Sequence, residues 1–280
     1  MKKLIVSGDS FTDPRFRSTA YPDMDTSWPK WPELLGKKLN MRVINLGRGG
    51  AGNEYIHSTL QDAIMNTPKD EIGMVIAGWS QAQRRDYQIS AGHNIEAENW
   101  HGKAENNDSY SELANFHHAR YSWNEHRVNP DGDLVSWVRK SLRHYYGLQV
   151  LCERYDIPYL QFQMIDLYKD YIDGIMPTEH EIMFEGKDSY ADRETYPGDK
   201  KADEEKIMRM IIDHQRHFDV SKFIGWPITR TLGGWPMNRG VMGWNVIEEE
   251  PYVIDEIDNH PNAAGQELIA KYIYEYIKEK

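Results

Sequence analysis

The sequence is poor in cysteine, since Cys152 is the only one among 280 residues. No disulfide can form within the chain, and a core of this size needs none. Long apolar runs are also missing, and nothing approaches the roughly 20 residues of a membrane-spanning helix. The run Leu4–Val6 near the N-terminus stops far short of a signal-peptide core. We therefore expect a cytoplasmic protein, with Cys152 buried as a small apolar side chain.

Basic residues are outnumbered, with 33 Lys and Arg against 44 Asp and Glu, so the formal net charge is −11. This balance argues against nucleic acid or an anionic membrane as a partner. Hydrophobic residues make up 40% of the chain and charged residues 28%, which is the composition of a folded protein.

Compact apolar runs alternate with amphipathic ones, as strands buried on both faces alternate with helices. The predicted strands are Leu4–Ser7, Arg42–Leu46, Ile72–Ala77 and Pro158–Met164. The predicted helices are Trp31–Asn40, Asn53–Met65, Asp133–Tyr155 and Ala263–Ile277. This order predicts an α/β fold with a parallel sheet between two helical layers, and a ligand site at the carboxyl ends of the strands.

Two ranges break this rhythm. Residues 81–131 are polar and poorly periodic, and residues 166–244 contain Gly225-Trp226-Pro227 and Gly233-Gly234-Trp235-Pro236. Loops of this length inside a compact domain usually form lids or binding loops. We expect one domain over residues 1–280, with both ranges as insertions over the catalytic edge.

A candidate nucleophile and its base lie at opposite ends of the chain. Ser10 ends the Gly8-Asp9-Ser10 turn after the first predicted strand, where its hydroxyl can face the ligand crevice. A hydroxyl needs a base to become a nucleophile, and His260 lies just before the last predicted helix. Asp258 is placed to orient the imidazole. Asp258 or Asn262 also suits the cap of that helix, and the two roles are compatible.

These two segments resemble the first and last sequence blocks of the SGNH (GDSL-like) hydrolases. Asn45–Gly50 and Val75–Ser80 resemble the second and third blocks, in the right order. The resemblance implies a flavodoxin-like three-layer α/β/α sandwich and a serine esterase. It also implies an oxyanion hole that includes the amides of Ser10 and Gly50. Trp79-Ser80 followed by Arg84 resembles a subgroup from tailed bacteriophages, for which association with a virion would be expected.

The chain departs from the family pattern at two positions. The third block usually carries an asparagine that donates to the oxyanion, and Ser80 stands there instead; Asn53 or Gln81 could replace that donor. The usual Asp-x-x-His spacing would put Ile257 in the acid's place. We expect Asp258 to be the acid, with Asp255 as the alternative.

Two competing motifs are weaker. Gly47–Gly52 matches the G-x-G-x-x-G dinucleotide fingerprint, but it follows the second predicted strand and lacks an acidic residue at the end of the next one. Histidines gather in the first insertion with no zinc-ligand spacing and no cysteine: they are His93, His101, His117, His118 and His126. We therefore expect neither a cofactor nor a metal.

The sequence predicts a hydrolase that forms an acyl-enzyme at Ser10 without a cofactor. The Trp-rich segments favour acetyl esters of a carbohydrate, since indole rings stack on sugars, and lipid or small-molecule esters are the other substrates considered. A second function remains open: a carbohydrate-binding module that keeps the scaffold but turns over weakly or not at all, which the serine at position 80 would favour.

Overall fold

The computed structural model describes residues 1–89, 117–121, 133–172, 198–242, 252–255 and 257–280. Five parallel strands form the central sheet in the order β2-β1-β3-β6-β7. They are β1 (Lys3–Ser7), β2 (Arg42–Asn45), β3 (Ile72–Trp79), β6 (Tyr159–Gln163) and β7 (Phe223–Ile224). The order is that of flavodoxin-like sheets, in which the chain reverses direction across the sheet at β1 and β3.

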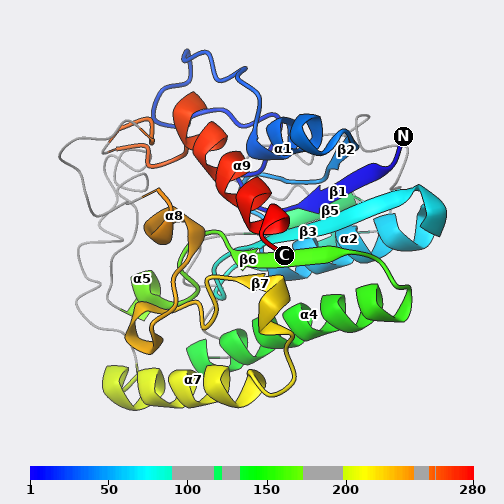
Figure 1. The fold of residues 1–280 in the computed structure, drawn as a ribbon. Coiled ribbons are helices and arrows are strands. Elements are labelled where there is room, and N and C mark those ends of the chain that lie inside the picture. Colours follow the sequence, from blue (N-terminus) through cyan, green and yellow to red (C-terminus); the bar gives the residue numbers. More distant parts are fainter. Residues whose placement is uncertain (90–116, 122–132, 173–197, 243–251, 256) are drawn as a thin grey trace.

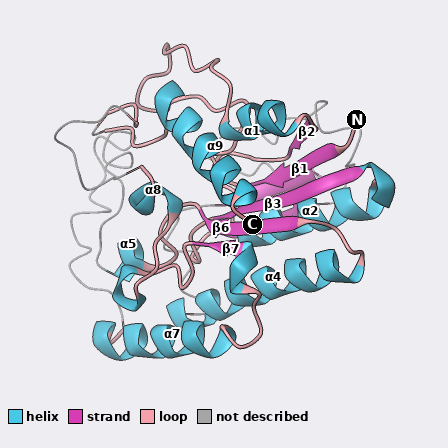
Figure 2. Ribbon diagram, viewed as in Figure 1, coloured by secondary structure: helices cyan, strands magenta, loops and turns pink. Residues whose placement is uncertain are grey.

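Helices cover both faces of the sheet (Figures 1 and 2). The α-helices are α1 (Trp31–Leu39), α2 (Asn53–Asn66), α4 (Leu134–Arg154), α5 (Lys169–Ile172), α7 (Lys200–His214), α8 (Met237–Gly240) and α9 (Ala263–Lys278). Short 3₁₀ helices are η1 (Lys69–Glu71), η4 (Val220–Lys222) and η5 (Arg230–Leu232). α1 and α9 pack together on one face, and α2, α4 and α7 on the other. The predicted α/β three-layer arrangement is confirmed.

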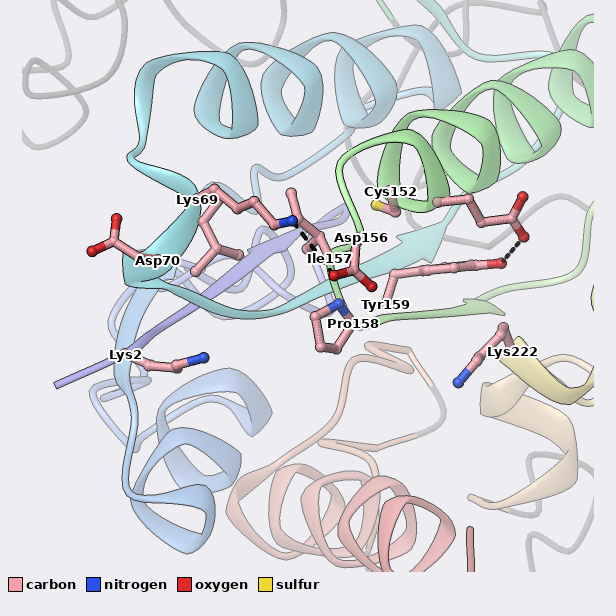
Figure 3. Close-up of a pocket in the computed structure, with 11 residues that line it drawn as sticks. Lys2, Lys69, Asp70, Cys152, Asp156, Ile157, Pro158, Tyr159 and Lys222 are labelled. Atoms are coloured by element: carbon pink, nitrogen blue, oxygen red, sulfur yellow. Dashed lines mark hydrogen bonds and ion pairs between the residues drawn. The ribbon is translucent and has the colours of Figure 1, made fainter.

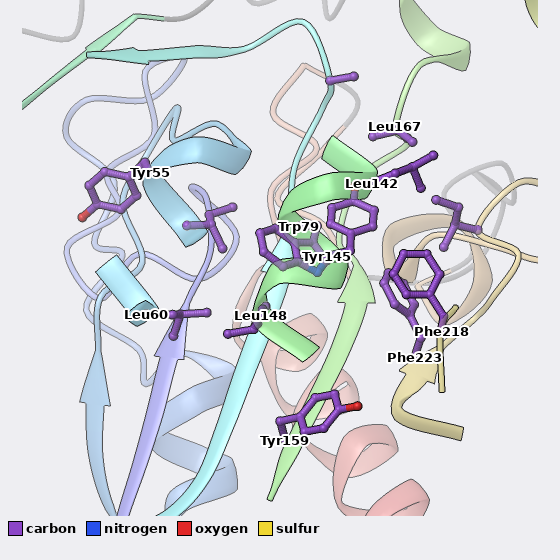
Figure 4. Close-up of a cluster of buried hydrophobic side chains, with 14 of the residues drawn as sticks. Tyr55, Leu60, Trp79, Leu142, Tyr145, Leu148, Tyr159, Leu167, Phe218 and Phe223 are labelled. Carbon is purple, nitrogen blue, oxygen red and sulfur yellow. The ribbon is translucent and has the colours of Figure 1, made fainter. Parts of the chain in front are cut away.

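Side chains alternate between the two cores along each strand, as a two-residue period requires. Leu4 and Val6 of β1 join the core under α1 and α9, whereas Ile5 joins the core under α2 and α4. In the core under α2 and α4, the Trp79 ring lies 4.7 Å from the Tyr145 ring (Figure 4). Both faces of the central strands are therefore buried.

The four predicted strands and four predicted helices are present, with ends that differ by one or two residues. The range 166–244 differs from its description as an insertion, because it supplies β7 and α7 to the sandwich. β7 has two residues, Phe223 and Ile224, too few for an alternating pattern to be visible in the sequence. Most of the range 81–131 lies outside the described residues. Two of its described parts form an antiparallel pair, β4 (Arg85–Ile89) and β5 (His117–Tyr121).

A buried glutamine fixes the end of the central strand β3. The Gln163 amide donates to the carbonyls of Ser80 (2.8 Å) and Ile165 (2.7 Å), and its oxygen accepts the Tyr145 hydroxyl at 2.7 Å. A buried amide is tolerated when its donors and acceptor are satisfied in this way. The chain therefore leaves β3 in one defined direction.

None of the helices in the described part of the chain is long and apolar enough to cross a bilayer.

His57 of α2 and His144 of α4 form a half-buried pair, with ring centroids 5.1 Å apart. The pKa of His144 is lowered from its ordinary 6.5 to about 4, chiefly by burial and further by the charges of His57 and Lys140, while Glu54 acts in the opposite direction. The pKa of His57 is also lowered by burial. Protonation of His144 is thus easier in the unfolded chain than in the folded one.

Stability should therefore fall as the pH drops from 6.5 towards 4, because the unfolded state then binds the extra proton. For His144 alone, the free energy of unfolding should be about 2 kcal/mol lower at pH 5 than at pH 7. Urea unfolding of the wild type and of His144→Gln at both pH values measures this, and the variant should lose about that much less. An equal loss in the two proteins would contradict the prediction.

Candidate active site

Ser10 lies in a tight turn at the carboxyl end of β1. Asp9 holds the turn, since its carbonyl accepts the Thr12 amide at 2.9 Å and its Oδ1 accepts the Phe11 amide at 3.1 Å. The Asp9 side chain is fully buried, whereas Ser10 is partly exposed. The turn therefore presents the Ser10 hydroxyl at the edge of the sheet where parallel α/β folds bind ligands.

Ser10, His260 and Asp258 form a hydrogen-bonded chain. His260 Nε2 lies 2.8 Å from Ser10 Oγ, and His260 Nδ1 lies 2.6 Å from Asp258 Oδ1. Because Nδ1 faces a carboxylate, it carries the ring proton, which leaves Nε2 free to accept the serine proton. The structure brings the three residues named from the sequence into the geometry of a nucleophile, a base and an orienting acid.

Asp258 remains ionised despite its burial. Burial acts to raise its pKa, but the hydrogen bond from His260, the His260 charge and the hydrogen bond from Ser18 outweigh that effect, so the pKa is lowered. The His260 backbone amide also donates to Oδ1, at 3.1 Å. An ionised acid can stabilise the imidazolium that forms when His260 takes a proton.

The segment after the Ser10 turn holds the acid in place, which no sequence motif indicated. Ser18 Oγ accepts the Tyr21 amide at 2.9 Å, and its single proton goes to Asp258 Oδ2. The rings of Phe16 and Phe11 lie 4.4 Å and 5.0 Å from the His260 ring. Together these contacts leave 13% of the His260 side chain exposed and limit its rotation.

Asp255, the alternative acid, has a different role in the loop. Its Oδ1 accepts the amides of Ile257 and Asp258, both at 2.8 Å, and its Oδ2 accepts the Tyr21 hydroxyl. Asp255 thus shapes the turn that carries Asp258, and Asp258 is the carboxylate in contact with His260. Asn262 caps α9 by accepting the Gly265 amide at 3.0 Å, so capping and orientation of the histidine fall to separate residues.

The backbone amides of Ser10 and Gly50 lie at this edge of the sheet. Within the described residues, neither the Ser10 nor the Gly50 amide donates to a protein acceptor. Gly50 has a φ of 68°, a left-handed conformation that favours glycine. The neighbouring Gly49 amide donates to Asp13 at 2.7 Å. Both amides named from the sequence as oxyanion donors are therefore without an acceptor among the described residues.

Two of the three side chains named as the third donor, Ser80 and Asn53, donate to other groups. Ser80 is fully buried, and its hydroxyl donates to Asp9 Oδ2 at 2.9 Å, so its one proton is used. The Asn53 amide donates to the Ser80 carbonyl at 3.0 Å and to Ser141 Oγ at 2.9 Å. The Gln81 oxygen accepts from Arg84 Nε at 3.2 Å, a bond that does not use its amide protons. The expectation that Ser80 donates to an oxyanion does not fit this arrangement.

A cavity of about 850 Å³ lies at the opposite edge of the sheet (Figure 3). Its lining includes Lys2, Ile72 and Tyr159, which stand at the amino ends of β1, β3 and β6. It is therefore separate from Ser10. No group of three or more metal-ligand side chains occurs among the described residues. Of the five histidines considered as ligands, His117 and His118 begin β5, whereas His93, His101 and His126 lie outside the described residues.

The sequence matches no family model and no curated protein. The chain is similar to a solved structure of a lipolytic G-D-S-L family member from Veillonella parvula, with 11% identity, 100% of both chains covered and a TM-score of 0.46. It is also similar to a psychrotrophic esterase from Pseudoalteromonas sp. (13% identity, TM-score 0.42) and a carbohydrate acetylesterase family member from Sinorhizobium meliloti (12%, 0.44). In both, 100% of this chain and 98% of the other are covered. At these identities none of them assigns a reaction to this chain.

The short contact between His260 Nδ1 and Asp258 should be visible by NMR. Its proton is expected well downfield of the backbone amides, because a hydrogen bond to a carboxylate deshields it. The resonance should vanish in Asp258→Asn and persist in the matched variant Asp255→Asn. Proton spectra at low temperature measure this. Loss of the signal in Asp255→Asn, with the signal kept in Asp258→Asn, would show that Asp258 is not the residue that binds the Nδ1 proton.

Proposed function

We propose that this protein is a serine ester hydrolase with Ser10 as nucleophile, His260 as general base and acid, and Asp258 as the orienting carboxylate. The support is the continuous hydrogen-bonded chain from Ser10 Oγ through His260 to Asp258. The amides of Ser10 and Gly50, which have no acceptor among the described residues, complete the requirements of acyl transfer, since they can stabilise the negative oxygen of a tetrahedral intermediate.

The reaction would proceed in two steps. His260 Nε2 takes the Ser10 proton while Oγ bonds to the ester carbon, and the carbonyl electron pair moves to the oxygen held by the two amides. The bond to the alkoxide then breaks, and His260 gives its proton to the leaving alcohol. His260 then takes a proton from water, whose oxygen attacks the acyl carbon. The bond between that carbon and Ser10 Oγ breaks, His260 returns the proton to Oγ, and the carboxylic acid leaves.

The proposed substrate is an acyl ester, preferably an acetyl ester, of a carbohydrate or a small molecule. Trp226 and Trp235 do not strengthen the carbohydrate preference, and Trp100, Trp123 and Trp244 lie outside the described residues. Trp226 packs edge-on against Phe218 and Phe223, with centroids 4.8 and 5.1 Å away, and Trp235 packs against Tyr272 at 5.6 Å. These rings serve internal packing, so the preference for sugars is to be tested with a panel of acetylated sugars and simple esters.

A fluorophosphonate and p-nitrophenyl acetate test the reaction directly. Ser10 Oγ should attack the phosphorus of the fluorophosphonate and displace fluoride. We therefore expect mass spectrometry to find the phosphonyl group on Ser10. Ser10→Ala should lower kcat by about 10⁴-fold or more, and His260→Gln by a similar factor. The matched control Ser27→Ala, at an exposed serine, should keep wild-type activity.

Absence of both turnover and labelling in the folded wild type would refute the hydrolase. Binding of an oligosaccharide by the same protein, measured by calorimetry, would then favour the binding module considered as the second function.

A further inference from the structure

A buried ion pair, Asp9–Arg84, lies beneath the candidate site and has no role in the two-step reaction. Arg84 Nη1 lies 3.5 Å from Asp9 Oδ2, and the two side chains are 5% and 0% exposed. Removing two charges from water is costly, so a pair of this kind is retained only where its geometry is well satisfied. Asp9 directly precedes the candidate nucleophile.

Arg84 also contacts the loop that carries Gly50. Its Nη1 donates to the Ala51 carbonyl at 3.2 Å. The Ala51 amide in turn donates to the Arg48 carbonyl at 3.1 Å, so the peptide groups on both sides of Ala51 are fixed. Gly50, with its positive φ, is thereby held between Arg48 and Ala51.

Asp86, which follows Arg84 in the same segment, is hydrogen-bonded to the start of α2. Asp86 accepts the Gly52 amide at 2.9 Å with Oδ1 and the Tyr55 amide at 2.8 Å with Oδ2. A Cβ on Gly52 would lie 2.7 Å from Asp86 Oδ2 and 3.0 Å from Arg84 Cβ. The close approach of the two segments therefore needs glycine at position 52.

Asp9 connects this assembly to the nucleophile turn. Its Oδ1 accepts the Phe11 amide, and its Oδ2 accepts both the Ser80 hydroxyl and Arg84. One carboxylate thus ties the turn with the Ser10 amide to the side chain that holds the loop with the Gly50 amide.

We propose that Arg84 is a positioning residue of the oxyanion hole: through Asp9 and the Ala51 carbonyl it fixes the Ser10 and Gly50 amides relative to each other. This inference rests on the proposed esterase function. It assigns to the segment after β3 a structural role in place of a direct side-chain donor to the oxyanion. The Ser80 hydroxyl then donates its hydrogen bond to Asp9 and not to the substrate.

The test compares Arg84→Met, which keeps the length of the side chain, with Arg84→Lys, which keeps its charge but loses the planar fork. For p-nitrophenyl acetate, kcat should fall by about 100-fold in Arg84→Met, because small displacements of catalytic groups cost this much. KM should change by less than about threefold, and Arg84→Lys should recover part of the rate. Lys140→Met, which removes an exposed ion pair to Glu54 on α2, is the control and should keep wild-type kinetics.

Phenylboronic acid separates positioning of the oxyanion hole from a general structural effect, because it becomes tetrahedral when Ser10 Oγ bonds to boron. Its inhibition constant should rise in step with the loss in kcat/KM, as expected for a transition-state mimic. Turnover within about threefold of the wild type in both folded Arg84 variants would overturn the inference. So would a fall in kcat with an unchanged inhibition constant.

Ser80→Ala gives an independent comparison. It tests whether Ser80 donates directly to the oxyanion, and it can be measured even if the Arg84 variants fail to fold. It removes one donor to Asp9 and leaves Arg84 in place, so kcat should fall by less than about tenfold. A loss of about 100-fold or more would restore Ser80 as a direct oxyanion donor and overturn the inference. Wild-type protein that fluorophosphonate does not label would instead refute the esterase on which the inference rests.

Discussion

The parallel pairing of β1 with strands on both sides is the constraint on which the rest of the site depends. Val6 pairs with Asn45 of β2 and with Ile76 of β3, so the three strands end at the same edge of the sheet. Parallel strands joined by helical crossovers all run in the same direction and bring their following loops together. The loops that carry Ser10, Gly50 and Ser80 are therefore neighbours, although they are separated by tens of residues along the chain.

The other half of the site comes from the far end of the sequence, and α9 holds it in place. Gln266, 2% exposed, accepts the Trp31 amide at 2.7 Å and donates to the Phe11 carbonyl at 3.1 Å. These bonds fix the start of α9 against the segment between β1 and α1. The loop that ends at His260 directly precedes this helix, so the packing of α1 on α9 sets the position of the histidine over Ser10.

Periodicity located the layers of the fold, whereas the three residues of the hydrogen-bonded chain came from two short motifs at the chain ends that resemble SGNH hydrolase blocks. These sequence patterns missed β7, since two residues carry no period. They also misplaced the Ser80 hydroxyl, because which acceptor a buried hydroxyl finds depends on how separate segments meet. Ser18, Phe16 and Arg84 were unassigned for the same reason, because their partners Asp258, His260 and Asp9 are distant in the sequence. The separation is 240 residues for Ser18 and 75 for Arg84.

Asp9 and Asp258 are both buried beside Ser10, yet their surroundings shift their pKa values in opposite directions. Burial raises the pKa of Asp9 more than Arg84 and Ser80 lower it, whereas hydrogen bonds to His260 and Ser18 leave the pKa of Asp258 lowered. A negative charge on Asp9 without a partner would repel an oxyanion held by the next residue's amide, since charges interact strongly where water is excluded. The guanidinium of Arg84 offsets that repulsion. The same carboxylate can then brace the Ser10 turn without opposing the charge that develops in front of it.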